Sequence, residues 1–154
     1  MDAAPTEAQV EGFIAKYDAT IAAQIRAART IMRARLPGAL ELVYDNYNAL
    51  AIAYGPTERV GDVIGSIAAY PRWISLFLAA GATLDDPDGL LKGEGARIRH
   101  VVLETPAQLS APGVVALLDQ AVRGARPPLD PAQPFRTVVK SISAKQRSRC
   151  PPEK

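Results

Sequence analysis

The sequence predicts an α+β fold, in which an antiparallel sheet of four to five strands carries N-terminal helices and one C-terminal helix. Three observations favour this fold. Apolar residues recur every three or four positions from residue 10 to residue 36, which is the spacing of one helical face. Residues 40–103 change to alternation and to β-branched or aromatic runs that turn residues interrupt. A second helical pattern follows at residues 110–124, and this order of elements is typical of a sheet with its helices on one face.

The N-terminal helical pattern contains an internal start signal. Thr6 is suited to begin a first helix and Asp18 a second, because short oxygen-bearing side chains accept hydrogen bonds from free backbone N–H groups at a helix start. We therefore expect two helices with a boundary near Asp18. Pro37 and Gly38 end the pattern, since proline lacks a backbone N–H and glycine is flexible.

Five strands are expected between the helices. The longest interruption, residues 80–96, is rich in Asp, Gly and Pro, so we expect a loop there or a short helical turn near Leu90. The final helix is expected to begin at Ser110, with Pro112 in its first turn, and to end at Gly124. The expected strands span residues 41–46, 49–54, 62–70, 73–78 and 97–104.

Length and composition predict one domain followed by a tail. The 154 residues are 48% hydrophobic and 22% charged, close to the globular average. We expect residues 1–126 to form the domain. Residues 127–154 are first proline-rich and then basic, so we expect a flexible tail, or one that packs only through Phe135, Val138 and Val139. Its removal is expected to leave folding intact. The charge of this tail favours only weak, salt-sensitive contact with nucleic acid.

The apolar stretches do not favour a membrane partner. The longest, Trp73 to Gly81, is far shorter than the roughly 18 residues that a membrane-spanning helix needs. The first residues contain no basic cluster leading into an apolar run, so no secretory signal is predicted and we expect a cytoplasmic location. Cys150 is the single cysteine, which excludes an intrachain disulfide.

The motifs of common enzyme classes are missing from the sequence. His100 is the single histidine, and no GxSxG or comparable nucleophile motif accompanies it. The glycine-bearing segment 89–95 lacks the Gly-Lys-Ser/Thr ending of a phosphate-binding loop. No set of acid, base and nucleophile emerges, so we expect a binding protein rather than an enzyme.

Aromatic and acidic residues gather near the first predicted strands. Glu41, Tyr44, Tyr47 and Trp73 are our candidate ligand-binding residues, because aromatic side chains beside a polar group are typical of a concave ligand site. We expect at least two of them to share one concave surface. The other interpretation is that these aromatic residues pack in the core or on a sheet face.

A second candidate site is the acidic part of the long loop. Asp85, Asp86 and Asp88 place three carboxylates within four positions, and hard cations such as calcium, magnesium or iron prefer oxygen ligands. Their spacing does not match a calcium-binding EF-hand. A solvated acidic turn is the alternative interpretation.

Several segments together resemble the YdhG-like family, a bacterial domain of unknown function. The resemblance covers about residues 10–124 and includes the segments PGALELVY, NALAIAYGP, RWISLFL, LLKGEGARIRHVVLE and VVALLDQAV. It implies an α+β domain, and it suggests a frataxin-like iron-chaperone role as an alternative function. Trp73 stands where many relatives have a histidine, which weakens the transfer of metal ligands. The leading hypothesis is a non-enzymatic module that binds a small ligand or a partner peptide, and the alternative is an iron-binding chaperone that uses the loop aspartates.

Overall fold

Two helices precede the first strand. Apolar residues along one face of each helix, and the capping residue Asp18 between them, account for their positions. In the computed structural model, which describes residues 4–151, α1 spans Ala4–Ile14 and α2 spans Ala19–Arg35. The carboxylate of Asp18 accepts a hydrogen bond from the backbone N–H of Ile21 at 2.9 Å. The predicted boundary between the two helices is therefore confirmed.

A six-stranded sheet forms the centre of the molecule. Its strands are ordered β5-β4-β3-β2-β1-β6; β6 runs parallel to β1, and every other pair is antiparallel. The α+β class is confirmed, but the expected antiparallel sheet of four to five strands is corrected to a mixed sheet of six. The strands are β1 Leu40–Asp45, β2 Leu50–Gly55, β3 Gly65–Ala69, β4 Ile74–Leu78, β5 Arg99–Leu103 and β6 Thr137–Ile142.

Strand β6 belongs to the segment that the sequence predicts to be a flexible tail. It pairs with β1 through the registers Leu42 to Val138 and Val43 to Val139. The prediction missed it because a two-residue apolar pattern between prolines and basic residues is too short to signal a strand. The hydrogen bonds of β6 are made with β1, which lies 96 residues earlier in the chain. The local sequence pattern does not reveal this distant partner.

The connection between α3 and β6 is also fitted against the domain. Gly38 adopts a positive φ of 87°, and a Cβ atom at this position would lie only 2.0 Å from the carbonyl oxygen of Asp130. The side-chain amide of Gln133 donates hydrogen bonds to the carbonyl oxygens of Gly38 and Pro56. The expected domain boundary at residue 126 is therefore corrected, since the chain stays packed on the sheet beyond it.

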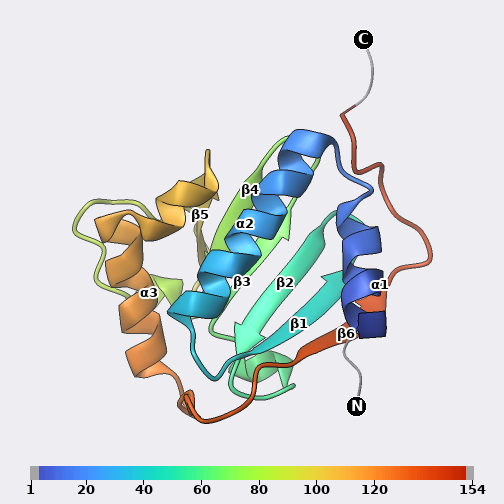
Figure 1. Cartoon of the computed structure of the whole chain (residues 1–154). Helices are drawn as coiled ribbons and strands as arrows, with labels where there is room; N and C mark the ends of the chain where they lie inside the picture. Colours follow the sequence, from blue (N-terminus) through green and yellow to red (C-terminus); the bar gives the residue numbers. More distant parts are fainter. Residues whose placement is uncertain (1–3, 152–154) are drawn as a thin grey trace.

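Helices cover one face of the sheet (Figure 1). Helix α2 lies across this face, α1 lies near β6, and α3, Pro112–Gly124, lies beside the β5 end. The core consists of the apolar faces of these helices and the large apolar residues of the strands that face them, including Met32 of α2 and Ile52, Ile67 and Leu76 of the sheet. We call the face of the sheet that the helices cover the helical face. No helix in the described part of the chain is both long and apolar enough to cross a membrane.

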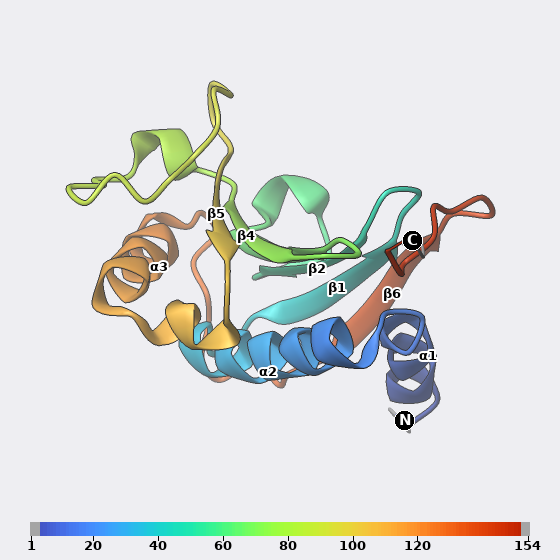
Figure 2. The same cartoon turned by 90° about the horizontal axis from the view of Figure 1, so that it is seen from above.

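The opposite face of the sheet carries only short segments, and we call it the open face. Figure 2 shows the 3-10 helix η1, Val60–Asp62, and the loop that leads into β5 standing on the side of the sheet away from α2. Residues 80–96 form an irregular connection as expected, with one 3-10 helix, η2, at Gly81–Thr83. A further 3-10 helix, η3, at Pro106–Ser110 leads into α3.

Removal of residues 127–154 is expected to destabilise the domain strongly. A chain that ends at Arg126 would lose β6 and expose the apolar side chains of Leu40 and Leu42. It would also remove one hydrogen-bond donor from each buried carboxylate, Thr137 from Glu41 and Arg149 from Asp45. We expect its melting temperature, measured by circular dichroism, to fall by about 10 °C or more. An unchanged melting temperature would show that the segment contributes nothing to the folded domain.

Candidate functional site

The open face contains a cavity with a floor of small side chains. Its volume is about 310 Å³, and the floor is formed by Ala51 and Ala53 of β2 and by Gly65 and Ser66 of β3. Successive residues of a strand point to opposite faces, so the large neighbours Leu50, Ile52 and Tyr54 enter the core while the alanines face the cavity. The small side chains leave room that larger ones would fill.

Larger side chains form the walls of this cavity. Tyr44 of β1 and Phe77 of β4 line it, as do Val60 of η1, Val63 and Ile98. Val60 is 74% exposed and Ile98 is 55% exposed, so both present apolar surface to water beside the cavity. A ligand in the cavity would cover part of this apolar surface, which is favourable in water.

Neutral groups supply the polar chemistry of the cavity. The hydroxyls of Tyr44 and Ser66 and the amide of Asn46 belong to its lining. Among the described residues that line the cavity, none carries a charge at neutral pH. His100 lies beside it, with its ring stacked on Phe77 at a centroid distance of 5.1 Å. The cavity therefore offers apolar contact and a few neutral hydrogen-bonding groups.

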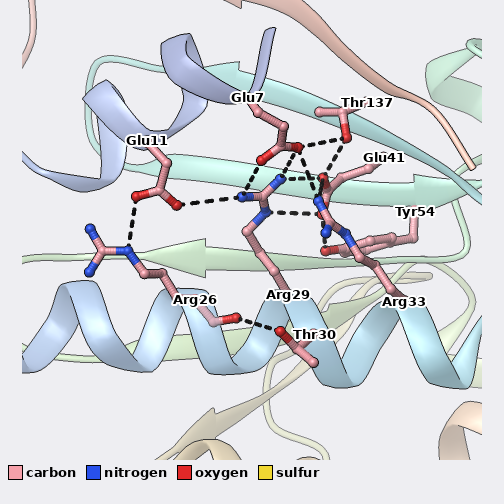
Figure 3. A network of polar contacts seen from close by, with 9 residues as sticks. All are labelled: Glu7, Glu11, Arg26, Arg29, Thr30, Arg33, Glu41, Tyr54 and Thr137. Atoms are coloured by element: carbon pink, nitrogen blue, oxygen red, sulfur yellow. Dashed lines mark hydrogen bonds and ion pairs between the residues drawn. The ribbon is translucent and has the colours of Figure 1, made fainter. Parts of the chain in front are cut away.

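A charged network occupies the helical face directly behind β1 (Figure 3). Glu41 is fully buried, and its carboxylate accepts hydrogen bonds from Arg29 at 2.7 and 3.2 Å and from Arg33 at 2.9 Å. The hydroxyls of Tyr54 and Thr137 donate to the same carboxylate at 2.5 and 2.9 Å. Two helical arginines, two strand hydroxyls and one strand carboxylate thus connect α2, β1, β2 and β6.

Helix α1 joins this network through its first turn. Glu7 accepts hydrogen bonds from Arg29 at 3.0 Å and from Arg33 at 3.2 Å. Glu11 bonds the exposed side chain of Arg26 at 2.9 Å. Each arginine of the pair 29 and 33 therefore lies between a buried carboxylate and a half-exposed one, and this arrangement attaches α1 to α2.

The ionisation of Glu41 follows from these contacts. Burial alone would raise the pKa of Glu41, but the hydrogen bonds and charge of Arg29, together with the hydrogen bonds from Arg33 and Tyr54, lower this pKa to about 2. Burial and the neighbouring negative charge of Glu41 raise the pKa of Tyr54 well above its usual value. At neutral pH, Glu41 is thus an anion and Tyr54 a neutral donor.

A second buried carboxylate, Asp45, lies at the C-terminal end of β1 and pairs with two cations. Asp45 is fully buried, and its carboxylate oxygens accept hydrogen bonds from Lys16 at 2.7 Å and from Arg149 at 2.8 Å. Burial would raise the pKa of Asp45, but the contacts with Lys16 and Arg149 lower it. Arg149 also donates to the carbonyl oxygen of Asn46 at 2.5 Å. The C-terminal segment therefore holds the β1–β2 turn, and Asn46 of this turn lines the cavity.

The four candidate ligand-binding residues do not come together in one site. Tyr44 lines the cavity, whereas Glu41 lies on the helical face because the two residues are an odd number of positions apart on one strand. Tyr47 is 42% exposed in the β1–β2 turn, with Arg147 over its ring. Trp73 is 43% exposed and stacks on Tyr70 at a centroid distance of 4.7 Å.

The sequence does contain a signal for the cavity floor. In the segment LAIAYG of β2, large and small apolar residues alternate, so one face of this strand is bulky and the other is nearly flat. Aromatic residues attract attention as ligand contacts, and we therefore missed Ala51, Ala53, Gly65 and Ser66. Size alternation within an apolar strand was the available indication.

The loop aspartates mainly stabilise the loop itself. Both carboxylate oxygens of Asp86 accept hydrogen bonds, from the backbone N–H groups of Leu90 and Leu91 at 2.9 Å each. The backbone of Asp85 exchanges two hydrogen bonds of 2.8 Å with the side chain of Gln120. Asp85, Asp86 and Asp88 line a second pocket of about 290 Å³ beside α3. Within residues 4–151, no group of three or more His, Cys, Asp or Glu side chains is placed to hold a metal ion.

The comparisons with known proteins add no assignment. The chain matches no family model, no curated protein and no solved structure. The resemblance to the YdhG-like family therefore stays a prediction.

Replacement of Glu41 by glutamine is expected to destabilise the domain by about 3–5 kcal/mol, because it removes the buried carboxylate that pairs with Arg29 and leaves this guanidinium only the half-exposed Glu7 and Glu11. The matched control is Glu11→Gln, which removes an exposed carboxylate of the same helix cluster and should cost no more than about 1 kcal/mol. Urea unfolding of both variants measures the difference. Equal stability of the two variants would contradict the role assigned to Glu41.

Glu41 also predicts an acid-sensitive stability. Its pKa is lower in the folded chain, about 2, than the ordinary value of 4.5. The folded state therefore binds fewer protons, so the contribution of Glu41 is fully present above about pH 4.5 and is lost as the pH falls towards 2. Urea unfolding across this range should show a shallower loss of stability in Glu41→Gln than in the wild type. Parallel pH profiles would refute this linkage.

Arg149→Ala is expected to lower the free energy of unfolding by about 3 kcal/mol, since Asp45 stays buried with one cationic partner fewer. Lys145→Ala is the matched control, because Lys145 is exposed four residues away. Thermal unfolding of both variants gives the comparison. Faster amide hydrogen exchange at residues 45–49 in Arg149→Ala alone would follow from release of the turn, and similar exchange in both variants would argue against it.

Proposed function

We propose that this chain is a non-enzymatic binding protein that holds a small, mostly apolar molecule in the cavity of the open face. The observation that carries the proposal is a cavity of about 310 Å³ whose floor lies on the two strands at the centre of the sheet and consists of three small side chains and the backbone of Gly65. Ligand sites are typically concave and mostly apolar, with a small number of polar groups that fix orientation.

The surrounding structure favours a preformed site. The floor strands β2 and β3 are hydrogen-bonded on both sides, and their opposite face is buried in the core. The walls come from segments with less support, η1 and the residue just before β5, where Val60 and Ile98 are exposed. A rigid floor with adjustable walls suits a protein that captures a small molecule from water.

The buried carboxylates support a structural role for the charged groups. Glu41 and Asp45 both lie on the helical face, and each is paired with arginine or lysine. They are therefore separated from the cavity by the sheet. This separation favours binding over chemistry in the cavity, since no ionised group is presented to a bound molecule by the lining that the structure describes.

Binding of the neutral fluorescent probe N-phenyl-1-naphthylamine tests the proposal. The variant Ser66→Phe places a ring on the cavity floor, in a strand position that tolerates aromatic residues, and should weaken probe binding about tenfold or more. Val102→Phe is the matched control, because Val102 is exposed on the adjacent region of the sheet and does not line the cavity. Equal probe affinity in the wild type and in both variants would overturn the proposal.

A further inference from the structure

We infer that the molecule held in this cavity is an uncharged aromatic compound. This inference rests on the proposed function and concerns the chemical class of the ligand. Three features of the lining carry it, namely the charge of the wall residues, the shape of the floor and the placement of two aromatic side chains.

The uncharged lining favours neutral ligands over ionic ones. The polar members of the lining are a phenol, an alcohol and an amide, from Tyr44, Ser66 and Asn46. The arginines that flank Val60 and Ile98 in sequence, Arg59, Arg97 and Arg99, do not line the cavity. Arg99 donates to the carbonyl oxygen of Gly95 at 2.8 and 3.0 Å, and the guanidinium of Arg59 lies 4.0 Å from the carboxylate of Asp62. A carboxylate or phosphate buried here would lose its hydration without gaining a counter-ion, which is costly.

The floor is shaped for a flat molecule. Ala53 and Ser66 are direct partners across β2 and β3, and their neighbours Ala51 and Gly65 lie on the same two strands. With side chains no larger than serine, these four positions form a shallow surface about two strands wide, and adjacent strands lie about 4.8 Å apart. A planar ring system contacts such a surface over its whole face. A flexible aliphatic chain would lose conformational freedom on the same surface.

Two aromatic side chains flank this floor. Tyr44 is the cross-strand partner of Ala51 on one side, and Phe77 is the cross-strand partner of Ser66 on the other. Both side chains line the cavity. Aromatic rings interact favourably in stacked or edge-to-face arrangements, so a ring that lies on the floor meets an aromatic partner at each side. The neutral hydroxyls of Tyr44 and Ser66 can then hydrogen-bond to one polar substituent.

A matched pair of fluorescent probes tests the charge. N-phenyl-1-naphthylamine and 8-anilino-1-naphthalenesulfonate share their ring system, and only the second carries a sulfonate. We expect the neutral probe to bind the wild-type chain about tenfold more tightly at both low and high salt. Ser66→Lys, which introduces a cation on the floor, should reduce this preference about tenfold or reverse it. Val102→Lys is the control for added surface charge and should leave the preference unchanged.

A competition experiment tests the aromatic part of the inference. The neutral aromatic alcohol 2-naphthol should displace N-phenyl-1-naphthylamine from the wild-type chain at a lower concentration than the neutral aliphatic alcohol 1-decanol. Displacement by 1-decanol at the lower concentration would overturn this part.

The outcomes separate this inference from the proposed function. If neither probe responds to Ser66→Phe, the cavity is not the binding site and the proposed function fails. If both probes respond to Ser66→Phe but the anionic probe binds as tightly as the neutral one, the cavity binds ligands and the inference about charge is wrong. Loss of both probes in Ser66→Phe, with the neutral probe preferred and 2-naphthol the better competitor, supports both.

Discussion

The burial of Glu41 is the constraint on which the arrangement of the domain depends. A carboxylate with no solvent contact remains ionised only when cations and hydrogen-bond donors replace its hydration, and here Arg29, Arg33, Tyr54 and Thr137 do so. These groups come from one helix and two further strands. Their convergence fixes the position of α2 on the sheet and the register of β6 beside β1. Through the same arginines, the network also reaches α1.

The two faces of β1 have different roles: the helical face stabilises the fold, and the open face contributes to the proposed ligand-binding cavity. Glu41, Val43 and Asp45 point to the helical face, where ion pairs and the core occupy the available space. Tyr44, between them, points to the open face and lines the cavity. Since β1 is hydrogen-bonded on both sides and held by buried charges at each end, it provides a firm position for this wall. The stability of the helical face thus allows small side chains and exposed aliphatic ones to persist on the other face.

Local patterns were sufficient for most of the fold and for little of the candidate site. The helical periodicity, the cap at Asp18 and the alternation of β1 to β5 are properties of neighbouring residues, and the structure agrees with them. Strand β6 depends on pairing with a distant edge, so its short apolar pattern did not indicate it. For the same reason the tail expected from residue 127 onward became part of the domain. Glu41 and Tyr44 lie three positions apart on one strand, so strand alternation places them on opposite faces, and the expectation that both contact one ligand is wrong.

The division of the sheet into a structural face and a binding face is tested most directly by chemical-shift mapping of the ¹⁵N-labelled full chain with N-phenyl-1-naphthylamine. The account predicts that the shifted amide signals belong to the open-face lining, chiefly Ala51, Ala53, Gly65, Ser66 and Phe77. It also predicts that signals of α1 and of the outer part of α2 stay in place, since these helices lie behind the sheet (Figure 2). Shifts that concentrate along the helices, or a titration that leaves the β2 and β3 signals unchanged, would contradict it.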